Sequence, residues 1–160
     1  MGSSSKDYVF ASSRVRSVEK YLLTREKAEA LIDSKTPADA LKILEDLGYG
    51  DGADNLRPDQ FVALLAEEIR KAYTFIRGIA PDEKDLYAFM YLYDYHNLKV
   101  FLKSEFLGID GEAFLIDVGT IPTAGLGPMV RDRDFVGMTD IMKNAVLAVV
   151  DVFSRTGDPQ

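Results

Sequence analysis

The sequence contains no cysteine and a single histidine, His96. The lack of cysteine excludes disulfides, thiolate metal ligands and a cysteine nucleophile. One imidazole is too few for zinc and non-haem iron sites, which generally take two or more His or Cys ligands. No uncharged apolar run approaches about 20 residues, so no segment predicts a direct membrane span.

An excess of basic residues is also missing. The chain has 26 acidic and 19 basic side chains and a formal net charge of -7. Its lysines and arginines are scattered among acids, which argues against a phosphate-binding stripe and therefore against nucleic acid as a partner. Hydrophobic residues make up 47% of the 160 residues, which is typical of a globular protein with a sizeable core.

Complete motifs for nucleotide, calcium or hydrolytic chemistry are lacking. The stretch "GDGADN" misses the ligand spacing and the final Glu of a calcium loop, so we expect a solvated turn. "AGLGP" has neither the third glycine of a dinucleotide loop nor the Lys of a phosphate cradle. No Gly-x-Ser-x-Gly elbow accompanies His96. We therefore predict no catalytic, cofactor-binding or metal-binding residue.

Helical periodicity dominates what is present, and strand alternation is nearly missing, so we predict an all-α fold. Thr24 and Thr36 are expected N-caps, and Pro37 suits a first helical turn. The periodicity fails between Gly108 and Gly137, where we expect short turns or short helical pieces but no long helix. The expected helices span residues 8–23, 24–33, 36–48, 58–78, 81–108 and 139–156.

Two further features bear on domain organisation. Residues 1–6, "MGSSSK", lack the apolar core of a signal peptide and are expected to be a flexible start, followed by a single all-helical domain over residues 7–160. The last predicted helix, residues 139–156, is apolar over much of its circumference, which predicts burial on several sides.

Polar residues interrupt the apolar helix predicted over residues 86–106. On a helical wheel of about 100° per residue, Asp94 and Asn97 lie inside the apolar stripe. His96 projects near the opposite, more polar side with Lys99 and Lys103. We therefore expect that the three polar side chains do not converge.

Burying the Asp94 carboxylate requires a cation or several hydrogen-bond donors. Arg14 or Arg16, at the edge of the first predicted helix, is the expected cation. Arg14, Arg16, Asp94 and Asn97 are accordingly predicted to form a structural polar hub. The alternative is a functional site, because perturbed carboxylates cluster at such sites.

Aromatic residues on the same predicted helix exceed what one core-facing stripe needs. The aromatic residues that together cover several sides of it are Tyr87, Phe89, Tyr91, Tyr93 and Tyr95. They are either core residues or a second packing surface, since tyrosine suits interfaces that are apolar at one end and wet at the other. Tyr87, Tyr91 and Tyr95 are the candidate interface residues.

Three stretches together resemble a known family. They are the Arg-x-Arg pair at Arg14 and Arg16 in a helix opened by Tyr8, the "LGYG" ending at Gly50, and the "YDYHNLK" core of residues 93–99. In this order, and with the closing "SRTGDPQ", they resemble the N-terminal half of the C-type subunit of V-type (A-type) ATP synthases, whose eukaryotic relative is the d-type subunit of the vacuolar ATPase. The resemblance runs from about Tyr8 to Gln160.

The resemblance implies a multi-helix bundle covering about half of the family's chain, so we expect a fragment of a longer chain. It also implies a non-catalytic central-stalk connector that joins the central axle subunits to the membrane rotor ring, in support of proton or sodium transport and ATP synthesis or hydrolysis. The expected location is cytoplasmic, peripheral to a membrane. The alternative is an all-α protein-interaction adaptor unrelated to rotary ATPases.

Overall fold

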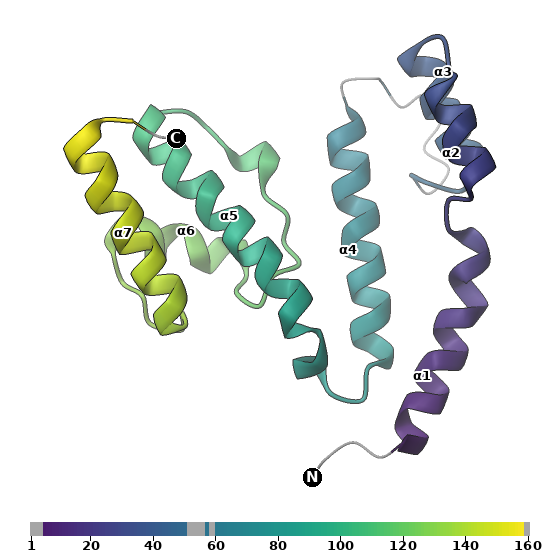
Figure 1. The fold of residues 1–160 in the computed structure, drawn as a ribbon, viewed down its shortest axis with the longest axis horizontal. Helices are drawn as coiled ribbons and strands as arrows, with labels where there is room; N and C mark the ends of the chain where they lie inside the picture. The colour runs from purple at the N-terminus through teal and green to yellow at the C-terminus, as the bar shows by residue number, and fades with distance from the viewer. Residues whose placement is uncertain (1–4, 51–56, 58–59, 159–160) are drawn as a thin grey trace. The chain divides into compact units, whose positions relative to one another are not determined.

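The computed structural model describes residues 5–50, 57 and 60–158, and every regular element in these residues is helical (Figure 1). The predicted all-α class is therefore confirmed. The predicted "GDGADN" turn and the predicted helix start at Pro58 fall mostly outside the described residues.

The α-helices are α1 Ser5–Val18, α2 Arg25–Ile32, α3 Pro37–Asp46, α4 Phe61–Ile79, α5 Tyr87–Leu107, α6 Thr123–Asp132 and α7 Asp140–Thr156. Short 3-10 turns lie at Glu19–Tyr21, Glu83–Leu86 and Glu112–Phe114.

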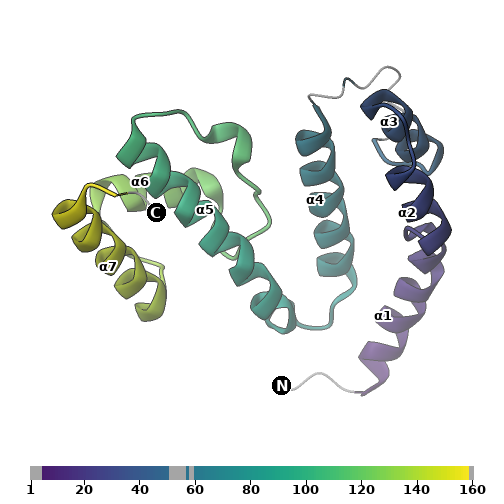
Figure 2. The ribbon, with the colours of Figure 1, turned by 45° about the horizontal axis from the view of Figure 1, so that its top comes forward.

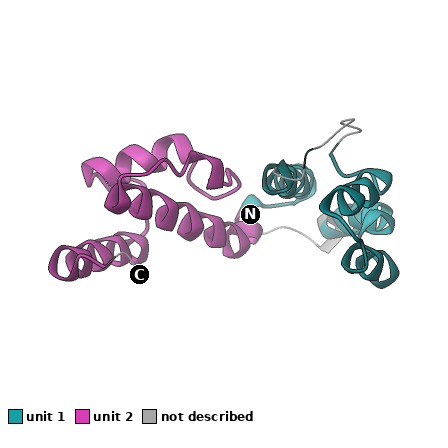
Figure 3. Cartoon of the chain, turned by 90° about the horizontal axis from the view of Figure 1, so that it is seen from above, with its two compact units in different colours: residues 1–83 teal, residues 84–160 magenta. Residues whose placement is uncertain are grey.

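The chain divides into two compact units, residues 1–83 and residues 84–160, which we call unit 1 and unit 2 (Figure 3). The single domain predicted over residues 7–160 stays a prediction. The predicted flexible start falls mainly on residues 1–4, outside the described residues, and α1 begins at Ser5.

Unit 1 consists of two helix pairs, α1 with α4 and α2 with α3 (Figures 1 and 2). The two predicted threonine caps are confirmed, because Thr24 Oγ1 accepts a hydrogen bond from the Lys27 amide at 3.4 Å and Thr36 Oγ1 accepts one from the Asp39 amide at 3.1 Å. Among the residues of unit 1 that the structure describes, the buried hydrophobic side chains are those of Leu41 on α3 and Leu64 on α4.

Unit 2 is built around α5, on which α6 and α7 pack. The helix is predicted to end near Leu107, and it does so at Gly108, whose φ of 65° is the left-handed conformation that glycine adopts without strain. The core between the three helices is contiguous. Its buried members are Leu98, Leu102, Ile121, Leu126, Val130, Met142 and Val146.

The segment between α5 and α7 contains one short helix. Its glycines and prolines predict short turns or short helical pieces, and α6 occupies residues 123–132 and buries Leu126 and Val130. Gly127 lets α6 approach α5 closely, because a Cβ atom at this position would lie 2.9 Å from the Phe101 ring. The glycine therefore serves helix packing.

Helix α7 buries one face and exposes another. Met142 and Val146 are buried, and the Phe153 ring stacks on Phe106 with centroids 3.8 Å apart. Ile141 and Val152, on another face, keep 75% and 45% of their surface exposed. The burial on several sides predicted for this helix is thus not found within the described residues.

Candidate functional site

The Asp94 side chain lies at the centre of unit 2 and is fully buried. Its carboxylate accepts three hydrogen bonds from the segment that precedes α6. Thr120 donates through Oγ1 at 2.6 Å and through its amide at 3.1 Å, and the Ile121 amide donates at 3.1 Å. Because hydrogen bonds to a charged group contribute about 1.5–3 kcal/mol each, these donors offset much of the cost of burying the carboxylate.

Gly119 makes this arrangement sterically possible. A Cβ atom on residue 119 would lie 2.0 Å from Asp94 Oδ1 and 3.3 Å from the Asp94 amide nitrogen. Any side chain would therefore push the segment away from α5 and break the bonds to Thr120 and Ile121.

Asn97 binds the same segment one turn further along α5. It is also fully buried. Its Nδ2 donates to the Ile116 carbonyl at 2.8 Å, and its Oδ1 accepts from the Ile116 amide at 2.9 Å. The carboxamide thus satisfies both backbone groups of one residue, as a neighbouring strand would.

His96 binds the segment as well. Its Nε2 lies 2.8 Å from the Phe114 carbonyl oxygen, and because a carbonyl only accepts, Nε2 carries the hydrogen. As predicted, the three polar side chains lie on different sides of α5 and do not converge on one another, but residues 114–121 run along the helix and supply a partner to each of them. We call Asp94, His96, Asn97 and their partners in residues 114–121 the polar cluster.

The predicted arginine partners lie in unit 1. Arg14 and Arg16 are both exposed on α1, and the Arg14 guanidinium lies 5.8 Å from the centroid of the Phe75 ring, a cation–π contact. Within unit 2 the Asp94 carboxylate receives its donors from Thr120 and Ile121. A pairing of either arginine with Asp94 stays a prediction.

The candidate interface tyrosines are half-buried on α5. Tyr91 and Tyr95 pack against the core of unit 2, and Tyr87 meets Tyr91 edge to face with centroids 6.1 Å apart. The apolar side chains that α5 exposes most are instead Phe89 and Leu92, at 59% and 67%. The role of the tyrosines at an interface stays a prediction.

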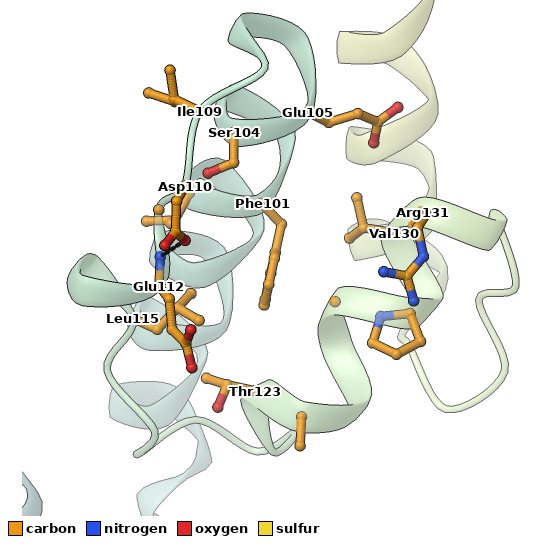
Figure 4. A pocket seen from close by; sticks show the side chains of 15 residues that line it. Phe101, Ser104, Glu105, Ile109, Asp110, Glu112, Leu115, Thr123, Val130 and Arg131 are labelled. Atoms are coloured by element: carbon orange, nitrogen blue, oxygen red, sulfur yellow. Dashed lines mark hydrogen bonds between the residues drawn. The ribbon is translucent and has the colours of Figure 1, made fainter.

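A pocket of about 620 Å³ lies beside the polar cluster, between α5, residues 109–115 and α6 (Figure 4). Apolar side chains form much of its wall. In Figure 4 the Phe101 ring points into the space between α5 and α6, opposite Val130. Gly111 closes one side tightly, since a Cβ atom there would lie 2.2 Å from Ser104 Oγ.

Several charged groups around this pocket make contacts within unit 2. Glu105 accepts from Arg133 at 2.6 Å, and this ion pair joins α5 to the end of α6. The Asp110 carboxylate accepts a hydrogen bond from the Glu112 amide at 2.9 Å (Figure 4). Arg131 lies 3.4 Å from Asp132. Across the described residues, no group of three or more histidine or carboxylate side chains is placed to hold a metal ion.

Sequence reasoning missed the partners of Asp94 and Asn97, namely Thr120, Ile121 and Ile116. Four of the five bonds that these two side chains make are to backbone groups, which any residue carries. Gly119 is the one residue in the sequence that signals this contact with α5, because a glycine outside a tight turn indicates close backbone approach.

These features define an all-α protein whose buried polar groups hold one segment against a central helix. Comparison with known proteins is more specific. Residues 11–160 match the family described as ATP synthase (C/AC39) subunit. The chain belongs to this family, as the resemblance of its sequence motifs indicates, and the alternative of an adaptor unrelated to rotary ATPases is set aside.

One curated relative is the C-type subunit of the A-type ATP synthase of Methanocaldococcus jannaschii, with 29% identity over 129 residues. The alignment covers 74% of this chain and 32% of the relative, so the matched region spans about a third of that protein's length. No solved structure matches the chain. None of the helices in the described residues has the length and apolar character needed to cross a bilayer.

Proposed function

We propose that this chain is part of the non-catalytic central-stalk connector of an A-type or V-type rotary ATPase. In this role it joins the central axle subunits to the membrane rotor ring at the cytoplasmic face of a membrane. The observation that carries the proposal is the family match over residues 11–160. The name of the Methanocaldococcus relative, a subunit of an A-type ATP synthase, supports it.

The structure of unit 2 suits a part that transmits force. A connector under torque must hold its shape, and the polar cluster ties residues 114–121 to α5 through directional bonds. It also needs surfaces for other subunits, and Phe89 and Leu92 expose apolar area on the same helix. Tyr87 lies near them in sequence and is proposed as part of the same interface.

Binding to stalk and ring components tests the proposal. The immobilised chain is expected to retain the axle subunits, the isolated rotor ring or both, and the double variant Phe89→Asp, Leu92→Asp is expected to weaken that retention at least tenfold. Phe114→Asp is the matched control, because Phe114 is 59% exposed but belongs to the turn after α5. Retention of neither component by the unaltered chain contradicts the proposal.

A further inference from the structure

Helix α7 carries a second apolar row, on the side away from the core. Ile141, Ala145, Ala148 and Val152 follow steps of four, three and four residues, and all four are exposed. This spacing is that of the contact positions of a coiled coil, where one helix packs against another. The two alanines at the centre of the row leave room for a second helix to approach.

A groove between α5 and α7 runs beside this row. It has a volume of about 360 Å³ and is bounded by Leu102 and Phe106 on α5 and by Val149 and Val152 on α7. Val149 and Val152 keep 47% and 45% of their surface exposed. An apolar groove between two helices is the shape that receives the apolar stripe of an amphipathic helix. We call the row and the groove together the α7 surface.

The charges beside the groove indicate what kind of helix fits. Lys99 and Lys103 stand one turn apart on its α5 side, both exposed, and neither has an ion-pair partner among the described residues. In a chain of net charge -7, two such lysines next to an apolar groove favour an acidic partner. Asp158, near the end of α7, is the acidic residue among those that line the groove.

We propose that the α7 surface binds an amphipathic α-helix of another polypeptide, with its apolar stripe on the row from Ile141 to Val152 and its acidic side chains facing Lys99 and Lys103. The inference rests on spacing, groove and charge. It does not depend on the chain acting in a rotary ATPase.

A pair of designed helical peptides tests the proposal directly. Both have about three heptads with Leu and Ala at the contact positions, and they differ in carrying Glu or Lys at the flanking positions. Fluorescence anisotropy with the full chain is expected to show the Glu peptide binding at least tenfold more tightly than the Lys peptide at low salt. The difference should shrink as salt is added, because exposed charges are screened.

Variants of the chain test whether the peptides bind at the α7 surface. The double variant Lys99→Glu, Lys103→Glu is expected to reverse the preference, so that the Lys peptide binds more tightly. Val152→Asp is expected to weaken both peptides at least tenfold. Lys143→Glu is the matched control, because this exposed lysine lies on α7 but outside the groove and the row, and it should leave the preference unchanged. Circular dichroism of each variant checks that the helices are retained.

Three results overturn the proposal. One is equal binding of the two peptides, and another is no binding of either to the folded chain. The third is self-association of the chain that Val152→Asp abolishes, seen by sedimentation, which would assign the α7 surface to a second copy.

Discussion

In unit 2 the polar cluster adjoins a contiguous buried apolar core, whereas in unit 1 the described helices leave most of their apolar side chains partly open. Unit 1 buries Leu41 and Leu64. Phe10 on α1 and Phe61 on α4 remain 62% and 51% exposed. A cavity of about 920 Å³, lined by residues of α1, α3 and α4, adds to this open packing.

The difference follows from how each unit is layered. In unit 2, residues 114–121 run along α5 while α6 and α7 pack on other parts of it, so α5 has several neighbours. In unit 1 the main helix contacts are those of α1 with α4 and of α2 with α3, so each amphipathic helix has one main neighbour. We infer that unit 2 carries most of the stability of the isolated chain and that unit 1 depends more on contacts with other polypeptides.

Removing the Asp94 carboxylate should have the largest effect on unit 2. Asp94→Ala leaves the buried Thr120 and Ile121 amides without an acceptor, and the expected loss in the free energy of unfolding is about 3–5 kcal/mol. Urea denaturation followed by circular dichroism measures it. Asp132→Ala, at an exposed ion pair, is the control and should change the value by less than about 0.5 kcal/mol. Similar small losses for both variants would refute a structural role for the polar cluster.

Truncating a core side chain in each unit sharpens the comparison. Met142→Ala in unit 2 is expected to cost about 3 kcal/mol, because the closed core around it cannot collapse into the cavity. Leu64→Ala in unit 1 should cost less than about 2 kcal/mol, since its surroundings are open and relax more easily.

Hydrogen exchange read by mass spectrometry separates these two effects by region. In the unaltered chain the amides of α5 and α6 should exchange more slowly than those of α1 and α4. Met142→Ala should speed exchange in unit 2. Equal protection of the two units in the unaltered chain would break the comparison.

Within unit 2, a smaller effect than those of Asp94→Ala and Met142→Ala is expected at Gly119. In Gly119→Ala the added methyl group would lie 2.0 Å from Asp94 Oδ1, so residues 119–121 must shift, at an expected cost of about 1–3 kcal/mol. Gly125→Ala is the control, because a Cβ atom there has open space and alanine favours the helix, so it should leave stability unchanged or raise it by up to about 1 kcal/mol. Thermal unfolding compares the two. A loss of stability in Gly125→Ala as large as in Gly119→Ala would contradict the steric account.

Local signals predicted much of the secondary structure. The threonine caps of α2 and α3 lie where the sequence places them, and α5 ends at the expected glycine. The first helix ends earlier than its apolar spacing predicts: α1 stops at Val18, and a 3-10 turn follows. The glycines and prolines after Gly108 left the position of α6 open, and this short helix packs its apolar residues on α5.

The sequence by itself determined the all-α class, the family and the burial pattern expected of Asp94 and Asn97, since helical spacing, capping residues and family motifs are all local. Only the tertiary structure decided what these two side chains and His96 bind. Their partners are mainly backbone groups of residues 114–121, which carry no residue-specific signal and come within reach only when the chain folds back along α5. The exposed row on α7 was decided in the same way: the sequence makes the helix apolar on several sides, and packing selects which side the core covers.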